Sequence, residues 1–207
     1  MSGPERVLLA WSSGKDSAFA LHVLRSQGVQ GAGLLTTMNA TVQRVAMHAV
    51  RHALLEAQAA AVGLPLHTVD LPWPCSNETY EEAMGQALRA ARDEGIGAVA
   101  FGDLFLEDVR RYREDRMADT GLRPLFPLWG RDTTTLAEQM IDSGQKAVLT
   151  CVDPRAVPAD LVGRAYDRSL LKDLPSGADP CGETVERKGF VFADVLPTGH
   201  GEGGSHP

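Results

Sequence analysis

The chain has 207 residues, of which 43% are hydrophobic and 23% are charged, and it includes 21 glycines and 12 prolines. This composition predicts an ordinary globular protein with one sizeable core, and it contains neither a membrane-spanning run nor an export signal. A net charge of -7 disfavours loose binding to nucleic acid, and three cysteines without CxxC spacing suggest neither a disulfide framework nor a zinc site. We therefore expect a soluble, cytoplasmic protein.

Short apolar runs alternate with longer helical patterns from Val7 to about Thr150, which is typical of βαβ units. Five strands are predicted, at Val7 to Trp11, Gly33 to Thr37, Leu66 to Leu71, Ala98 to Gly102 and Ala147 to Val152. Helices are predicted at Asp16 to Ser26, Val50 to Val62, Glu78 to Glu94, Phe105 to Asp119 and Thr134 to Ser143. This order predicts an α/β fold with a doubly wound, mostly parallel five-stranded sheet, which binds ligands at the carboxyl ends of its strands.

The pattern changes after about residue 152. A short helix near Tyr166 to Leu174 and a last strand from Phe190 to Leu196 follow. We interpret residues 1–152 as an α/β domain, residues 153–197 as a small extension packed on it, and residues 198–207 as a flexible, glycine-rich tail.

The strongest chemical signal is the run Ser12-Ser13-Gly14-Lys15-Asp16-Ser17, which follows the first predicted strand and opens a helix. The first amides of a helix are unpaired and its dipole is positive there, so this turn suits a phosphate group. Gly14 allows close approach of the backbone, and the serine hydroxyls and Lys15 complete an anion site. The alternative is a serine-capped helix start with an exposed lysine.

The run from Ser12 to Ser17 resembles the SGGKDS pyrophosphate loop of the N-type ATP pyrophosphatases, the adenine nucleotide alpha hydrolase superfamily, with Ser13 in place of the first glycine. Further segments resemble the diphthine–ammonia ligase-like family of that superfamily, and the likeness extends from about Val7 to Asp194. These segments are Met47-His48, Gln58-Ala59, Gly63 to Leu66, Phe101-Gly102-Asp103, Leu106-Glu107, Arg110, Tyr112 to Glu114, Pro127 to Trp129 and Asp179 to Glu183.

The resemblance implies a Rossmann-like fold of the HUP type and an ATP-dependent ligase, with residues 1–152 as the ATP-binding domain and the extension as the acceptor side. In such an enzyme a carboxylate attacks the α-phosphate of ATP, pyrophosphate leaves, and ammonia displaces AMP. The implied ligands are ATP, Mg²⁺ and a carboxylate-bearing acceptor, either a small molecule or a protein side chain. We expect neither nucleic acid nor a membrane as partner, and a homodimer is one candidate assembly.

We expect the loop from Ser12 to Ser17 to hold the departing pyrophosphate, with Lys15 neutralising its charge. Asp16 and Asp103, at the ends of the first and fourth predicted strands, are the expected magnesium ligands, and Asp103 is also an expected catalytic residue. Compensation of the helix dipole by Asp16 and a helix cap by Asp103 are the alternatives. The remaining nucleotide contacts are expected from Gly102 and from the backbone of Thr36, Thr37 and Met38.

Contacts with the acceptor are expected from His48, Arg110, Glu114 and Trp129. A solvated helix face explains the pair of Arg110 and Glu114 equally well, and a core position explains Trp129. Near the C-terminus the family carries a GExGE pattern followed by an aromatic residue, a histidine and a hydroxyl residue. Here Glu183 and Glu186 preserve the two carboxylates and are expected to be catalytic, whereas Val185 replaces the second glycine.

Two other functions stay open. One is a sulfur or amine transferase that modifies tRNA, which the acidic charge and the lack of paired cysteines disfavour. The other is a non-catalytic protein that binds adenine nucleotides, which the altered C-terminal pattern favours.

Overall fold

The computed structural model describes residues 5–46, 49–182 and 191–195. Its main sheet has parallel strands in the order β4 (Leu66–Leu71), β2 (Gln30–Asn39), β1 (Arg6–Ala10), β5 (Ala98–Ala100) and β6 (Arg123–Leu125). The short strand β3 (Arg44–Val45) runs antiparallel to the carboxyl end of β2. Because the strand order reverses between β1 and β5, their carboxyl ends lie at a topological switch point, where open α/β sheets bind ligands.

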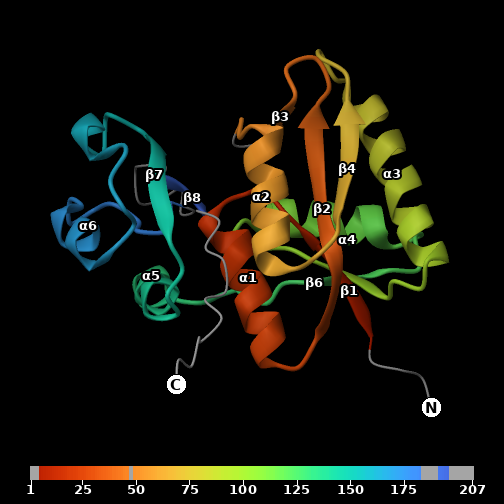
Figure 1. Cartoon of the computed structure of the whole chain (residues 1–207), viewed down its shortest axis with the longest axis horizontal. Coiled ribbons are helices and arrows are strands. Elements are labelled where there is room, and N and C mark those ends of the chain that lie inside the picture. The colour runs from red at the N-terminus through yellow and green to blue at the C-terminus, as the bar shows by residue number, and fades with distance from the viewer. Residues whose placement is uncertain (1–4, 47–48, 183–190, 196–207) are drawn as a thin grey trace, which may run out of the picture.

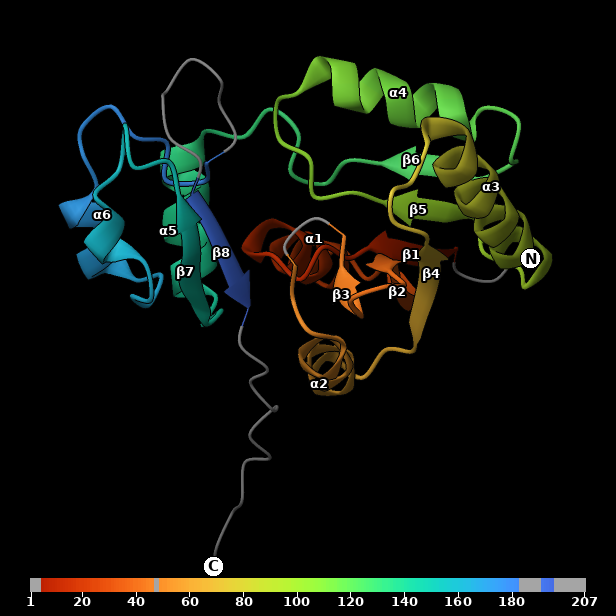
Figure 2. The ribbon, with the colours of Figure 1, turned by 90° about the horizontal axis from the view of Figure 1, so that it is seen from above.

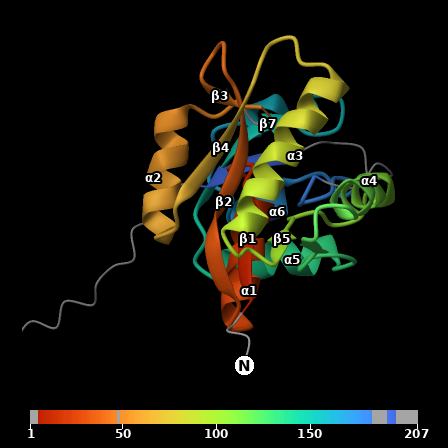
Figure 3. The ribbon, with the colours of Figure 1, turned by 90° about the vertical axis from the view of Figure 1, so that its right-hand side faces the viewer.

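Helices cover both faces of this sheet (Figure 2). The helices α1 (Lys15–Ser26) and α2 (His52–Val62) cover one face, and α3 (Asn77–Asp93) and α4 (Glu107–Met117) cover the other. Figure 3 shows the sheet between α2 and α3. Successive strand residues alternate between the two layers, so Leu9 packs with α1 and α2 whereas Leu8 packs on the α3 side. This double burial explains why the strands are apolar throughout.

Local sequence signals set the ends of the helices. The helix α2 ends at Gly63, whose φ of 67° is left-handed and suits glycine. The helix α3 begins after Ser76, whose side chain accepts a hydrogen bond from the amide of Thr79 at 3.1 Å. The predicted helices therefore occur where the sequence places them, with small differences at their ends.

The main sheet has six strands, five of them parallel; the fifth parallel strand is β6, and the prediction of Ala147 to Val152 for that position is wrong. The strand β6 has only three residues and includes Pro124, so it carries no clear strand pattern. Proline is tolerated there because, among the described strands, β6 pairs only with β5 and forms an edge of the sheet. The run Ala147–Val152 does form a strand, β7, but it pairs with β8 (Val191–Val195) in a separate antiparallel sheet.

The C-terminal part of the chain lies beside α1 (Figure 1). It consists of α5 (Thr133–Asp142), β7, the 3-10 helix η1 (Ala159–Leu161), α6 (Arg168–Asp173) and β8. Its buried side chains join the same core as those of α1; they include Leu136, Met140, Leu149 and Leu170. The amide of Val195 in β8 donates a hydrogen bond to the carbonyl oxygen of Ser13 at 3.1 Å, so this unit reaches the loop that follows β1.

Within the described ranges, no helix has both the length and the apolar character needed to cross a membrane. None of the three cysteines, all of which lie in the described ranges, forms a disulfide: Cys75 is partly exposed, Cys151 is exposed and Cys181 is buried.

Candidate active site

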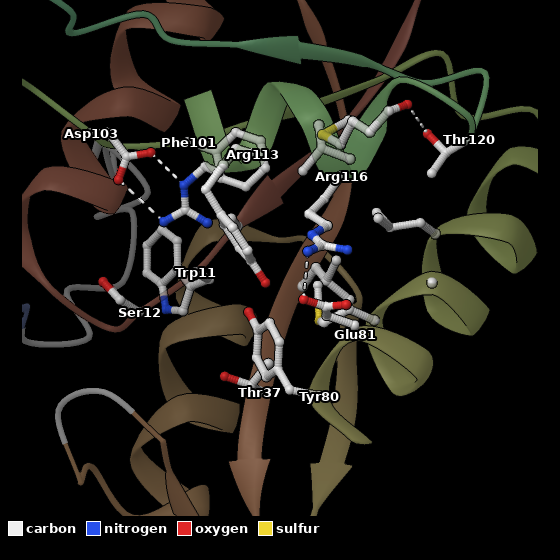
Figure 4. Close-up of a pocket in the computed structure, with 18 of the residues that line it drawn as sticks. Trp11, Ser12, Thr37, Tyr80, Glu81, Phe101, Asp103, Arg113, Arg116 and Thr120 are labelled. Carbon is white, nitrogen blue, oxygen red and sulfur yellow. Dashed lines mark hydrogen bonds and ion pairs between the residues drawn. The ribbon is translucent and has the colours of Figure 1, made fainter. Parts of the chain in front are cut away.

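A cleft of about 470 Å³ opens at the carboxyl ends of β1, β2 and β5 (Figure 4). One end of the cleft is lined by strand ends and the start of α1, namely Trp11, Ser12, Asp16, Ser17, Thr37, Phe101, Gly102 and Asp103. The other end runs between α3 and α4 and is lined by residues that include Tyr80, Glu81, Met84, Tyr112, Arg113 and Arg116. The cleft therefore adjoins the loop that the sequence singles out, at the switch point of the sheet.

The loop opens α1 without the serine cap that was the alternative to an anion site. The N-cap residue is Gly14, which has no side chain. Ser12 Oγ accepts a weak hydrogen bond from the Gly14 amide at 3.3 Å, and Ser17 Oγ donates to the Gly14 carbonyl oxygen at 2.9 Å. Because Lys15 is only 2% exposed, the exposed lysine of that alternative is also wrong.

Two buried polar atoms of the loop lack a hydrogen-bond partner among the residues that the structure describes: Ser13 Oγ and Asp16 Oδ1. Ser13 is fully buried and has a φ of 75°, a left-handed conformation that is strained for a residue other than glycine. Buried polar atoms in native proteins are normally paired. Within the described residues these two oxygens are therefore exceptions, and Asp16 is the one of the two residues that lines the cleft.

The ammonium group of Lys15 joins the loop to the C-terminal unit. Its Nζ lies 2.7 Å from Asp16 Oδ2 and donates to the Cys181 carbonyl oxygen at 2.7 Å. The ring centroid of Tyr166 lies 6.0 Å away. Tyr166 donates from its hydroxyl to the Pro180 carbonyl oxygen at 2.7 Å, and burial raises its pKa well above the ordinary value. Lys15 is not among the residues that line the cleft, and its contact with phosphate stays a prediction.

Gly102 brings the end of β5 against the start of α1. A Cβ atom at this position would lie 2.9 Å from the Ser17 amide nitrogen and 3.0 Å from the Asp16 carbonyl carbon, closer than side chains allow. Only glycine permits this approach without displacement of the backbone. As a result, Asp103, the next residue, lines the same cleft as Asp16.

The two aspartates fit a magnesium ion that is held jointly with phosphates. Mg²⁺ usually takes one or two carboxylates besides substrate phosphates and water. Asp16 and Asp103 supply two carboxylates to the cleft, and Asp16 Oδ1 has no protein partner in the described chain. Among residues 5–46, 49–182 and 191–195, no group of three or more His, Cys, Asp or Glu residues that could hold a metal occurs.

The helix α4 places Arg113 and Arg116 in the cleft. Arg113 forms two hydrogen bonds to Asp103, and its guanidinium lies 4.3 Å from the ring centroid of Phe101. Arg116 is paired with Glu81 of α3 at 2.7 Å, across the other end of the cleft. Sequence reasoning assigned neither arginine to the site, although Arg113 is among the residues that carry the family resemblance and both lie in the same charged run as Arg110.

Arg110, Glu114 and Trp129 lie together but do not line the cleft. Arg110 Nε donates to Glu114 Oε1 at 2.8 Å, and its guanidinium lies 4.8 Å from the Trp129 ring centroid. Arg110 and Glu114 occupy a flank of α4 about 60° to 100° away from Arg113, given the 3.6-residue helical repeat. Their contact with the acceptor stays a prediction that the cleft does not support.

The end of β2 contributes one of its three predicted residues to the cleft. Thr37 lines it, whereas Thr36 and Met38 are buried and do not. This difference follows from the alternation of side chains along a strand. Thr36 donates from its hydroxyl to the Trp11 carbonyl oxygen at 2.7 Å, and the Thr37 carbonyl oxygen accepts from the Ala46 amide at 2.9 Å. Recognition of adenine by this backbone stays a prediction.

Tyr80 is a further residue of the cleft that sequence reasoning missed. Burial raises the pKa of its hydroxyl, and the positive charge of Arg113 opposes that shift. Its position in the amphipathic helix α3 gave no sign of a site, because helical spacing predicts such an aromatic residue in the core.

Three predicted site residues, His48, Glu183 and Glu186, lie outside the described residues. Their roles stay predictions.

Comparisons with known proteins agree with the resemblance in the sequence. The family model described as the diphthamide synthase N-terminal domain matches residues 5–124. The chain is 30% identical over 209 residues to diphthine–ammonia ligase of Danio rerio, and the match covers 90% of this chain and 82% of that protein. A crystal structure described as a predicted subunit of tRNA methyltransferase from Methanocaldococcus jannaschii has a TM-score of 0.46 and 16% identity. That match covers 94% of this chain and 97% of the other, and it is too distant to inform function.

The matched region contains the whole loop from Ser12 to Ser17 and both aspartates of the cleft. The chain therefore belongs to the diphthine–ammonia ligase-like family of the N-type ATP pyrophosphatase superfamily, a family of ligase enzymes.

Proposed function

We propose that the protein is an ATP-dependent ligase that adenylates a carboxylate and then converts it into an amide with ammonia. The relative named diphthine–ammonia ligase makes diphthine the first acceptor to consider. ATP binds in the cleft at the switch point, with its β- and γ-phosphates on the loop from Ser12 to Ser17. The α-phosphate then faces the open part of the cleft.

One observation carries this proposal: the start of α1, which has no side-chain cap, lies at the edge of the cleft, and two buried oxygens beside it have no hydrogen-bond partner among the described residues. A helix N-terminus binds anions through its free amides and its dipole. Ser12 and Ser17 both line the cleft and add hydroxyl groups. This set of donors suits a phosphate chain better than it suits a neutral ligand.

In the first step, a carboxylate oxygen of the acceptor attacks the α-phosphorus, and the bond to the bridging oxygen breaks. Pyrophosphate leaves with the electron pair of that bond, and the loop stabilises its charge through amides and hydroxyls. In the second step, ammonia attacks the acyl carbon, AMP leaves, and the nitrogen loses a proton. Arg113, the arginine of the cleft that lies next to Asp103, would orient either the α-phosphate or the acceptor carboxylate.

Asp16 and Asp103 would hold a magnesium ion beside the phosphates. When bound, this ion would neutralise charge on the phosphate oxygens. The unpaired Oδ1 of Asp16 supports this assignment, and the pairing of Asp103 with Arg113 keeps a second carboxylate at the same edge of the cleft.

We assign residues 1–152 to ATP binding and residues 153–197 to the acceptor side, with the carboxylates of Glu183 and Glu186 as catalytic groups. Of the first range, α5 and β7 belong to the C-terminal part, and β7 pairs with β8 in a sheet separate from the main one. The hydrogen bond between Val195 and Ser13 and the contact between Lys15 and Cys181 support this arrangement, since both join the extension to the loop.

ATP labelled at both the α- and γ-phosphates tests the proposal. The protein is incubated with Mg²⁺, ammonium and a diphthine-bearing protein, and the labelled products are separated. We expect AMP and pyrophosphate, with amide formation on the acceptor. A variant without the two loop hydroxyls, Ser12→Ala with Ser17→Ala, is expected to release both products more slowly. Release of ADP and phosphate would contradict the proposed chemistry, and tight ATP binding without turnover on any acceptor would favour a nucleotide-binding protein instead.

A further inference from the structure

We propose that Gln58 is a positioning residue that, together with the end of β8, fixes the peptide between Ser13 and Gly14 for nucleotide binding. This inference rests on the proposed ATP site. Gln58 lies on α2, outside the cleft, so its effect on ATP passes through the loop.

The side chain of Gln58 is 1% exposed and joins three segments of the chain. Its Oε1 accepts a hydrogen bond from Trp11 Nε1 at 2.9 Å, at the end of β1. Its Nε2 donates to the Val195 carbonyl oxygen at 2.6 Å and, more weakly, to the Ser13 carbonyl oxygen at 3.4 Å. Both the oxygen and the nitrogen of the buried Gln58 amide are therefore hydrogen-bonded, at the point where the sheet, the loop and β8 meet.

The Ser13 carbonyl oxygen accepts a second hydrogen bond, from the Val195 amide at 3.1 Å. In a trans peptide, the carbonyl group and the following amide point in opposite directions. Because the two donors hold the Ser13 carbonyl toward α2 and β8, the Gly14 amide points the other way. That amide lies 3.3 Å from Ser12 Oγ, and Ser12 lines the cleft.

This contact also explains how a strained residue persists in the loop. Ser13 has a φ of 75°, and such conformations last only where the surroundings hold them. The donors from Gln58 and Val195 supply that restraint. Without them, we expect the peptide to rotate toward an ordinary conformation, which would turn the Gly14 amide away from the phosphates.

The test compares two substitutions of Gln58 with a control elsewhere in the same core. Gln58→Leu removes all three hydrogen bonds, whereas Gln58→Glu keeps the acceptor for Trp11 but loses the donors to Ser13 and Val195. Leu170→Ala, on α6, creates a cavity at a fully buried position of the same core and removes no hydrogen bond to the loop. Titration calorimetry with Mg-ATP gives the dissociation constant and the binding stoichiometry, and thermal unfolding gives the stability of each variant.

Both Gln58 variants are expected to bind ATP about ten-fold more weakly with unchanged stoichiometry, in line with the loss of one or two hydrogen bonds. Leu170→Ala is expected to lower the melting temperature and to leave the dissociation constant unchanged. A purely structural role for Gln58 would reduce the folded fraction, and hence the stoichiometry, without altering affinity.

ATP affinity equal to that of the wild type in both Gln58 variants would overturn the inference. If neither variant folds, Val195→Pro decides the question, because it removes the amide that donates to Ser13 and keeps Gln58; undiminished ATP affinity in that variant would also overturn it. Failure of the wild-type protein itself to bind ATP would refute the proposed function instead, so the two failures are distinguishable.

Discussion

The guanidinium group of Arg113 faces the carboxylate of Asp103 with two hydrogen bonds, of 2.6 Å from Nε to Oδ2 and 3.2 Å from Nη2 to Oδ1 (Figure 4). This pairing joins α4 to the end of β5 at the edge of the cleft. A planar guanidinium with parallel donors also binds phosphates and free carboxylates in the same manner. The pair carries no net charge, but Nη1 of the guanidinium keeps N–H donors for the place where the proposed reaction brings together the α-phosphate and the acceptor.

Replacement of Arg113 by lysine tests this role. Lysine keeps the charge but cannot form the paired hydrogen bonds, so we expect kcat/KM for pyrophosphate release to fall about ten- to hundred-fold. The matched control is Arg111→Lys, an exposed position on the same helix, which should leave the rate unchanged. Equal rates for the wild type and the Arg113 variant would remove Arg113 from the mechanism.

The backbone conformation of Ser13 leads us to expect that its replacement by glycine stabilises the protein. Substitution of Ser13 by glycine should remove the strain of a φ of 75° and the buried hydroxyl without a partner in the described chain. We expect the free energy of unfolding to rise by about 1 kcal/mol, measured by urea denaturation. Ser13→Ala separates the two causes, because it removes the hydroxyl but keeps the strain. A glycine variant less stable than the alanine variant would show that strain at this position is negligible.

Gly102 should not tolerate even one added methyl group. In Gly102→Ala, the new Cβ would lie 2.9 Å from the Ser17 amide nitrogen, so β5 and α1 must separate. We expect a loss of about 1 to 3 kcal/mol in the free energy of unfolding and several-fold weaker ATP binding. Gly177→Ala is the control, because a Cβ there meets nothing within 4 Å. Similar behaviour of the two variants would argue against close packing at Gly102.

The sequence was sufficient to place the loop from Ser12 to Ser17 but not to predict which face of α4 borders the cleft. The loop from Ser12 to Ser17 depends on a strand, a turn and a helix that are adjacent in the chain, so local signals were sufficient to locate it. The helix α4 is polar at most positions, and its orientation depends on tertiary packing, including burial of Met117. Sequence periodicity therefore could not distinguish the face of Arg113 from that of Arg110.

Strand pairing was the other limit of sequence reasoning. The run Ala147–Val152 is apolar enough for the main sheet, whereas β6 has three residues and a proline. Pairing between distant segments decided which of them extends the sheet. The roles of Gln58 and Tyr80 likewise depend on contacts between distant segments that no local pattern reveals.

Because the Tyr166 hydroxyl is buried, we expect the folded protein to lose stability at high pH. Burial raises its pKa well above the ordinary value of 10.0, so the folded chain keeps a proton that the unfolded chain releases. Stability is therefore complete below that ordinary value and declines as pH rises toward the pKa of the folded state. Urea denaturation between about pH 9 and pH 11 should show a shallower decline in Tyr166→Phe than in the wild type. Identical slopes would show that Tyr166 does not control alkaline unfolding.

The two cleft aspartates predict a specific dependence on magnesium. Asp16→Asn and Asp103→Asn should each raise the Mg²⁺ concentration needed for half-maximal ATP turnover by about ten-fold, because each removes one charged ligand. Asp142→Asn, an exposed surface position, is the control. A magnesium requirement unchanged in both cleft variants would exclude these residues as ligands.

A crystal structure with Mg²⁺ and the α,β-methylene analogue of ATP tests the central claim most directly, because this analogue cannot be cleaved between the α- and β-phosphates. We predict that its β- and γ-phosphates contact the amides and hydroxyls from Ser12 to Ser17, with the α-phosphate open to the cleft beside Asp103 and Arg113. A triphosphate bound elsewhere, or with its α-phosphate enclosed by the loop, would contradict the account.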